Sequence, residues 1–438
     1  MSRGLGSPLS FLLAGWGWLL LTSLLGLATF WSIVRGSPLP PGLRLLHVHG
    51  VLIGGLLQLM TGFALTASDL TAQEGTRSKH RLLFVGINLV ALGFTAGAAL
   101  RDPTLTLLAG LLLAAVCAPI VRHLVHAFRV CSAGTSLSSF FFGFSLLGLF
   151  GSLILGALLS GAWYPTWHGI IRLGHVHAGI LLFLTMAIVG TVQLTLPILL
   201  HRALHSAALG QAVLLLLPAC AAGLLTGFLL SSIHIQLVAG GGLILTLALC
   251  CFNLLRTWSQ AGQPGSTATD HLLTALCFLF IMTCIGLALG INDLWTPPAL
   301  PYGTLHMVAY THTAFLGFVL QAVVGGLSMA FPPLLAAQRI PNQKKRGPYR
   351  DVLERIMNRW RAAQVSTVSF GALGLVLVAS LTWNLPLSSP WIQAATWGSL
   401  GLLLIHLTMV TVKVTQALNA HPGHERTTTN ESKHPDGR

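Results

Sequence analysis

The chain has 438 residues, of which 54% are hydrophobic and only 8% are charged, and its formal net charge is +14. This composition, with a mean hydropathy of +0.77, excludes an ordinary soluble enzyme. Apolar runs long enough to cross about 30 Å of hydrocarbon recur along the whole length and predict an all-α polytopic membrane protein. The seven cysteines form no CxxC or CxxxC pair, so we expect neither a disulfide framework nor a zinc or iron–sulfur site.

The hydrophobic pattern predicts twelve membrane-spanning helices. Their approximate ranges are 9–34, 43–67, 81–100, 103–127, 138–160, 168–198, 207–230, 233–255, 271–291, 303–331, 365–384 and 391–416. We therefore expect one transmembrane domain over residues 1–416, which includes a basic loop at 332–364, and a disordered tail at 417–438. The first apolar run is as long as the others and has no small-residue cleavage site behind it, so no cleavable signal peptide is expected.

The distribution of basic residues predicts the orientation. With the N-terminus inside, only four of the 24 lysines and arginines fall on the outer side, namely Arg35, Arg44, Arg101 and Arg172. The positive-inside rule then places both termini in the cytoplasm of a cell whose inner membrane holds the protein. The positive charge therefore indicates topology and contact with membrane lipids, and a nucleic-acid partner is not expected.

Three of the predicted spans carry the same signature, a histidine followed thirteen residues later by a glycine. The copies are His49 with Gly62, His177 with Gly190, and His312 with Gly325. A histidine inside a bilayer is costly unless it has a partner or a function, so three at equivalent depth predict a cofactor site. Because they lie four helices apart, they also predict three four-helix arcs that close around a pseudo-threefold axis.

Two of these copies resemble subunit I of the haem-copper oxidase superfamily, and within it the C-family oxidases and nitric oxide reductases. Arg44-x4-His49-Gly50 lies in the second span, and His312-Thr-Ala-Phe-Leu-Gly317 in the tenth is similar to the family's HxH(S/T)xxLG(W/F) pattern. The resemblance covers roughly residues 9–416 and implies that His49 and His312 are the axial ligands of one low-spin haem b. Two neutral imidazoles saturate such an iron and favour electron transfer.

The chain departs from this family at the oxygen-reducing centre. Tyr310 stands where the family has the ligand of the high-spin haem. The family's copper ligands correspond here to His175 or His177 in the sixth span, and to a single His234 where the family has a histidine pair. The resemblance therefore implies a degenerate binuclear centre, with copper binding doubtful, and it leaves open whether the protein is an oxidoreductase.

Polar residues near the repeated histidines have a functional and a plainer interpretation. Arg44 and Arg172 each precede a repeated histidine by five residues, and either pair with haem propionates or simply reach to the interface. Gln58 and Gln321 each lie nine residues after one and could bond neighbouring helices. The single histidine of the last span, His406, is more typical of a helix–helix hydrogen bond than of a ligand.

The sequence thus predicts a haem b protein that takes part in respiratory electron transfer or in the chemistry of O2 or NO. A cytochrome c or quinol would be its electron donor, and other respiratory subunits its partners. One alternative is an NnrS-type haem-copper membrane protein, although the chain reads HVHGVL where that family continues with HEM. The other is a transporter or channel without a cofactor, whose pore is lined by histidines.

Overall fold

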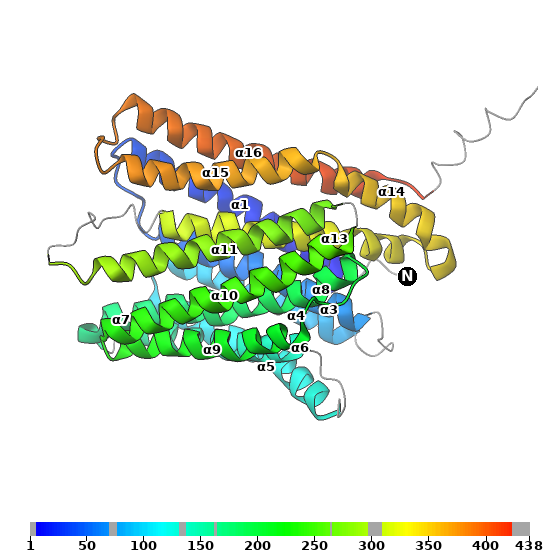
Figure 1. Cartoon of the computed structure of the whole chain (residues 1–438), viewed down its shortest axis with the longest axis horizontal. Coiled ribbons are helices and arrows are strands. Elements are labelled where there is room, and N and C mark those ends of the chain that lie inside the picture. The colour runs from blue at the N-terminus through cyan, green and yellow to red at the C-terminus, as the bar shows by residue number, and fades with distance from the viewer. Residues whose placement is uncertain are drawn as a thin grey trace, which may run out of the picture.

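The computed structural model describes residues 6–69, 77–130, 137–161, 164–262, 265–296 and 309–422, and within these ranges every regular element is a helix. The helices run side by side along the long axis of the molecule (Figure 1). Their bounds are α1 Pro8–Val34, α2 Leu43–His49, η1 Gly50–Leu57, α3 Gln58–Asp69, α4 Arg77–Leu100, α5 Pro103–Val130, α6 Leu137–Ser160, α7 His168–His177, η4 Ala178–Thr185, α8 Met186–Leu199, α9 Ala207–Leu229, α10 Ile233–Ala261, α11 Thr267–Asn292, η5 Thr313–Leu320, α13 Gln321–Arg339, α14 Arg346–Asn358, α15 Arg361–Leu381 and α16 Pro390–Asn419.

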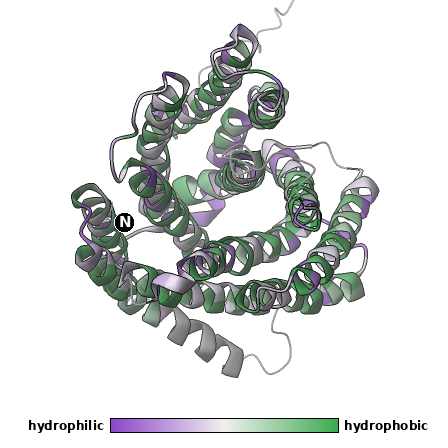
Figure 2. Cartoon of the chain, turned by 90° about the vertical axis from the view of Figure 1, so that its left-hand side faces the viewer, coloured by the Kyte–Doolittle hydropathy of each residue, from purple (hydrophilic) through white to green (hydrophobic). Residues whose placement is uncertain are grey.

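Eleven helices of the described part are long and apolar enough to cross a membrane, and this all-helical architecture is compatible with the predicted polytopic membrane protein. The predicted span at 103–127 is a helix, α5, but its apolar stretch covers only Pro103–Pro119. Hydrophobic residues predominate along the helices (Figure 2), and many large apolar side chains are exposed on the outside, such as Leu82, Val238 and Leu404. This pattern is the one that lipid contact favours, because hydrocarbon offers polar side chains no partner.

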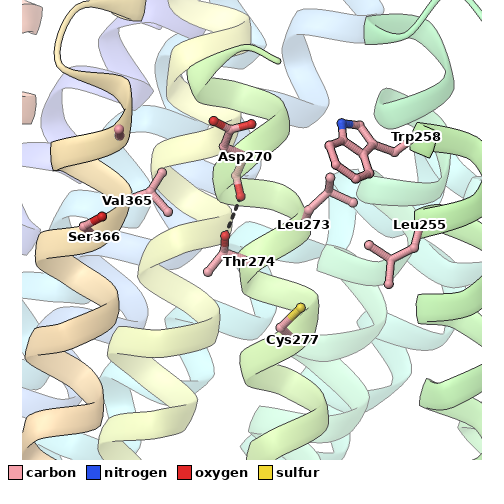
Figure 3. A pocket seen from close by; sticks show the side chains of 9 residues that line it. Leu255, Trp258, Asp270, Leu273, Thr274, Cys277, Val365 and Ser366 are labelled. Atoms are coloured by element: carbon pink, nitrogen blue, oxygen red, sulfur yellow. Dashed lines mark hydrogen bonds between the residues drawn. The ribbon is translucent and has the colours of Figure 1, made fainter. Parts of the chain in front are cut away.

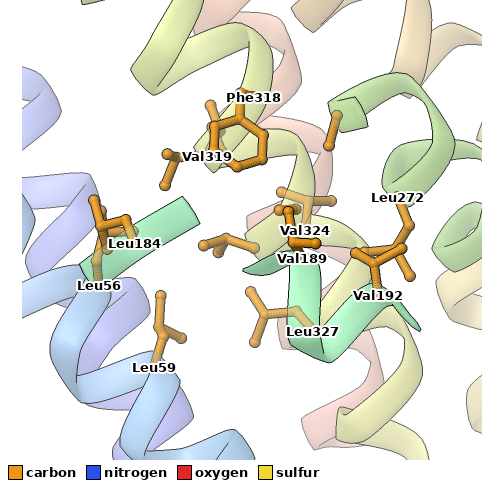
Figure 4. Packing of buried hydrophobic residues seen from close by; sticks show 14 of the residues in the cluster. Leu56, Leu59, Leu184, Val189, Val192, Leu272, Phe318, Val319, Val324 and Leu327 are labelled. Carbon is orange, nitrogen blue, oxygen red and sulfur yellow. The ribbon is translucent and has the colours of Figure 1, made fainter. Parts of the chain in front are cut away.

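The three spans that carry the His-x13-Gly signature form the centre of the bundle. In their apolar stretches 56, 72 and 83% of the residues are buried, against 22–44% in the other eight long helices. Side chains from all three meet in one hydrophobic cluster, for example Leu56, Leu184 and Val319 (Figure 4). The remaining helices therefore surround these three, and we call the three the central helices.

Each central helix changes its winding at the repeated histidine. The residue after His49, His177 and His312 begins a π-helical segment of eight residues, η1, η4 and η5 respectively, and an α-helix resumes after it. π-Helical turns are rare and frequently mark functional sites. The sequence signature thus corresponds to the same unusual local structure three times.

The repeated glycines lie where each central helix crosses the span before it. A Cβ atom on Gly62 would lie 3.1 Å from the Phe11 Cβ of α1, and one on Gly190 only 2.5 Å from the Phe141 Cβ of α6. Gly325 has the same relation to α11, where the Ala268 carbonyl oxygen is 3.1 Å away. The absence of a side chain therefore permits close helix contact at all three crossings.

The segment expected as a basic loop at 332–364 is largely helical. Its first residues continue α13, and α14 follows at the end of the bundle. Tyr349, Leu353 and Met357 of α14 are buried, and the Tyr349 hydroxyl donates a hydrogen bond to the Ala420 carbonyl oxygen at 2.9 Å. The predicted tail at 417–438 begins within α16, and residues 423–438 lie outside the described part.

The start of α1 and the end of α16 lie at the same end of the bundle, together with α14 (Figure 1). The repeated histidines His49, His177 and His312 lie near the start of the central helices, toward the opposite end of the bundle. We call the end with α14 the inner end and the end with the repeated histidines the outer end.

Candidate histidine site at the outer end

Two ring positions recur at the start of each central helix. The first-position side chains are His47, His175 and Tyr310, and the second-position histidines follow two residues later as His49, His177 and His312.

Each first-position ring packs on a glycine of the preceding span. A Cβ atom on Gly26 would lie 2.8 Å from the His47 ring, and one on Gly156 would lie 3.1 Å from the His175 ring. Tyr310 covers Gly286 in the same way, again at 3.1 Å. The three glycines are spaced 130 residues apart, so Tyr310 occupies the place that histidines hold in the other two copies.

The first-position histidines are fixed by equivalent hydrogen bonds. The Nδ1 atom of His47 lies 2.7 Å from the Thr22 carbonyl oxygen of α1, and that of His175 lies 2.8 Å from the Ser152 carbonyl oxygen of α6. The second-position histidines His49 and His177 bond within their own helices. Nδ1 of His49 lies 3.1 Å from the Leu45 carbonyl oxygen, and Nδ1 of His177 lies 2.9 Å from that of Leu173.

These hydrogen bonds determine which ring nitrogen is available. A carbonyl oxygen only accepts hydrogen bonds, so Nδ1 must carry the proton in all four histidines. In a neutral imidazole Nε2 then holds the lone pair, which is the state that a metal ligand needs. Metal-bound histidines almost always donate their other N–H to a carbonyl or carboxylate, and all four rings already do so.

His49 and His175 line one cavity between the first and second central helices. Their ring centroids are 6.4 Å apart with an interplanar angle of 22°, and the His49 ring also lies 5.3 Å from that of Phe94. The cavity has a volume of about 220 Å³. Its other walls are mostly apolar residues of η1, α5, α6 and η4, with Phe94 of α4.

The other predicted ligands lie elsewhere. The His177 ring contacts Phe228 of α9 at 4.6 Å, and the His312 ring contacts Phe30 of α1 at 5.3 Å. His234 is exposed at the start of α10. In the described part no three histidine, cysteine or acidic side chains are close enough to hold a metal ion, so His175, His177 and His234 do not assemble as a copper triad.

Arg44 and Arg172 are both exposed near the outer end, one in α2 and the other in α7. This placement suits both the pairing with haem propionates and simple contact with the membrane interface. The pairing of His49 with His312 across one haem stays a prediction.

A second group of polar side chains, not anticipated as a group from the sequence, is buried toward the inner end. The Nδ1 atom of His271 in α11 lies 2.6 Å from Oε1 of Gln321, whose Nε2 donates to the Ser369 hydroxyl at 3.0 Å. The His406 ring lies 5.6 Å from that of His271, and its Nδ1 donates to the Gln364 carbonyl oxygen at 2.9 Å. His406 therefore makes the helix–helix hydrogen bond expected of it.

Lys413 of α16 extends this inner polar cluster. Its side chain is fully buried, and its Nζ donates to the Met357 carbonyl oxygen at 2.8 Å and to the Gln364 side-chain oxygen. Through its bonds to His271 and Ser369, Gln321 links neighbouring helices, which is one of the two interpretations the sequence allowed. Because the cluster draws scattered polar residues from separate helices, it leaves no periodic signal in the sequence by which its members could be grouped.

A second cavity, of about 380 Å³, lies between α10, α11 and α15 (Figure 3). Asp270 and Cys277 of α11 line it, and the Thr274 hydroxyl donates to the Asp270 carbonyl oxygen at 2.7 Å. The Asp270 carboxylate forms an ion pair with Arg361 at 2.9 Å. This pair is partly exposed, so it contributes little stability.

The described helices are those expected of an integral multi-pass membrane protein, and four outer histidines hold Nδ1 against carbonyl oxygens. No family model matches the chain, and no curated protein matches its sequence. The functional argument therefore rests on the residues and their geometry.

Proposed function

We propose that this protein is an integral membrane haem protein that passes electrons or binds a diatomic gas such as O2 or NO. Three units of four consecutive spans each, twelve spans in all, would be related by a pseudo-threefold axis near the membrane normal. We call them the first, second and third units in chain order. The observation that carries the proposal is the set of outer histidines, whose Nδ1 atoms bond carbonyl oxygens and whose Nε2 atoms are left to bind iron.

The number of ligands favours haem over a bare metal ion. A structural zinc site takes four protein ligands and a catalytic one takes three, but among the described residues only two imidazoles share the outer cavity. Haem brings four nitrogens of its own and needs only two axial ligands. When bound, it would supply one-electron chemistry. The cavity is smaller than the 300–1,000 Å³ typical of small-molecule sites, so a macrocycle would have to displace leucine side chains of α5 and α6.

The family's second, oxygen-reducing haem lacks support in this chain. Tyr310 replaces a histidine at its ring position, and the single His234 lies exposed at the start of α10. We therefore propose one haem b per chain, with labile copper and little oxygen consumption when reduced cytochrome c or quinol is supplied. A respiratory partner subunit would deliver the electrons.

The haem proposal is tested on the full-length protein purified in detergent. A pyridine haemochrome assay should give one haem b per chain, and His49→Ala should abolish the low-spin reduced spectrum because an axial ligand is lost. The matched control is His201→Ala, which alters a histidine at the inner end. A wild-type protein that takes up no haem when haem is supplied would refute the proposal.

A cofactor-free transporter is the second candidate function. Gln58 and Gln193 favour it, because both are buried in central helices and their amide groups have no hydrogen-bond partner among the described residues. Buried polar groups of this kind are costly unless a ligand, ion or water meets them. This candidate predicts a protein without Soret absorption, so the haemochrome assay separates the two functions.

We also propose that both termini face the cytoplasm and that the protein lies in the inner membrane. The common location of the start of α1 and the end of α16, together with the basic helix α14, supports this orientation. Alkaline phosphatase fused after Trp383, in the turn between α15 and α16, should be active, and the same enzyme fused after Arg438 should be inactive. The reverse pattern would overturn the orientation.

A further inference from the structure

We propose that the iron is held by His49 and His175, at the junction of the first and second units, instead of by His49 and His312. This inference rests on the proposed haem function and assigns its axial ligands. The proposed ligands lie in the second and sixth predicted spans, whereas the family resemblance implies ligands in the second and tenth.

The separation of the two rings fits one metal between them. Two imidazoles that bind one iron from opposite sides, through bonds of about 2 Å, have ring centres roughly 6 Å apart, because each centre lies about 1 Å behind its nitrogen. The His49 and His175 centroids are 6.4 Å apart. The rings are nearly parallel, with an interplanar angle of 22°, and binding one iron between them requires that their Nε2 atoms face each other.

Both rings are held in the state that ligation needs. Nδ1 of His49 bonds a carbonyl oxygen in its own helix, and Nδ1 of His175 bonds one in α6. The Ser152 hydroxyl lies a further 3.2 Å from Nδ1 of His175. These bonds fix the tautomer and orientation of each ring before any metal arrives, which lowers the entropic cost of binding.

The walls of the cavity favour a flat apolar group. Gly110 of α5 and Gly156 of α6 present no side chains, and Phe94 and Phe183 add aromatic surface. A Cβ atom on Gly110 would approach only the Phe94 ring, at 3.8 Å, so a larger side chain there would extend into the cavity. Gly110 is therefore a place from which the cavity can be filled without moving the ligands.

His312 stands in a different setting. Its ring contacts Phe30 of α1, four residues beyond Gly26, the glycine that His47 covers. It therefore lies at the junction of the third and first units. His49 contacts His175 and Phe94 instead, at the junction of the first and second. A pair of axial ligands must meet at one junction, and the described ring contacts bring His49 to His175.

Single-residue variants of the purified full-length protein test the assignment. His175→Ala should lose the low-spin spectrum to the same extent as His49→Ala, and His312→Ala should keep it. The matched control is again His201→Ala, at the inner end, outside the set of outer histidines. His175→Met should restore a six-coordinate iron with a raised midpoint potential, because thioether ligation raises it.

The cavity itself is tested by filling it. Gly110→Leu should reduce the haem content of the protein at least tenfold, and Gly151→Leu should leave it unchanged, because Gly151 has open space and does not line the cavity. Both variants should show the same far-ultraviolet circular dichroism as the wild type. These readouts do not depend on any enzymatic activity.

The outcomes separate the two proposals. If the wild type binds haem and His312→Ala, not His175→Ala, loses the low-spin spectrum, the ligand assignment is wrong and the haem function stands. If Gly110→Leu retains full haem, the cavity is wrong as the site. If the wild type holds copper and no haem, or neither, both proposals fail.

Discussion

Replacing Gly148 by leucine should destabilise the protein far more than the same change at Gly151, also in α6. A Cβ atom there would lie 2.5 Å from the carbonyl carbon of Leu182 and 2.6 Å from the backbone nitrogen of Phe183. Both are backbone atoms of the π-helical segment η4, which cannot move as a side chain can. Overpacking of this kind costs about 3 kcal/mol or more, because α6 must separate from the central helix.

The matched control is Gly151→Leu, which lies three residues further along α6, where a Cβ atom would meet nothing within 4 Å. The midpoint temperature of unfolding in detergent should fall by many degrees for Gly148→Leu and change little for Gly151→Leu. Equal midpoints for the two variants would mean that α6 and η4 do not pack as closely as described.

The second large effect concerns the charge of Lys413. Gln364→Leu should destabilise the protein by about 2 kcal/mol, because a buried ammonium group then loses one of its two acceptors. Lys413→Met should cost far less, since a buried charge that is replaced by an apolar group of similar size needs no partner. The backbone carbonyl of Gln364 continues to accept from His406 in both variants.

A double-mutant cycle makes this contrast quantitative. The free energy of unfolding would be measured in mixed micelles for each single variant and for the double variant. In the Lys413→Met background, the cost of Gln364→Leu should shrink by more than about 1 kcal/mol, which is the signature of coupled neighbours. Additive costs would show that Lys413 does not depend on Gln364.

Much of the fold follows from the sequence, because a bilayer leaves few choices to an apolar chain. Continuous apolar runs predict spanning helices, since only helices satisfy their own backbone groups in hydrocarbon. The His-x13-Gly signature occurs in the three central helices because both of its residues are constrained by contacts inside the bundle. A histidine needs a partner inside the membrane, and a glycine permits the close crossing seen at Gly62, Gly190 and Gly325.

The remaining features depend on contacts between residues far apart in the chain. No local pattern shows that η1, η4 and η5 wind as π-helices, since their composition is that of any apolar helix. The inner polar cluster draws single residues from several helices. The His49–His175 contact has no local signal either, because its two residues lie in different spans. The 130-residue spacing of Gly26, Gly156 and Gly286 is a signal in the sequence that identifies His47, His175 and Tyr310 as equivalent positions.

The helix α14 illustrates a different limit. Its basic residues suggested a loop, because charge is the usual mark of a connection between spans. Tyr349, Leu353 and Met357 nevertheless recur at helical spacing, and all three are buried against the end of the bundle. A short amphipathic helix at an interface carries both signals at once, and the charge concealed the apolar face.

Low-temperature electron paramagnetic resonance of the oxidised, full-length wild type tests the central claim most directly. The claim is that outer histidines with available Nε2 atoms bind one haem iron from both sides. The spectrum should contain one low-spin ferric haem per chain with two imidazole ligands, and no stoichiometric copper signal. A high-spin haem as the only iron signal, or a spectrum without haem after expression with added haem, would contradict the account.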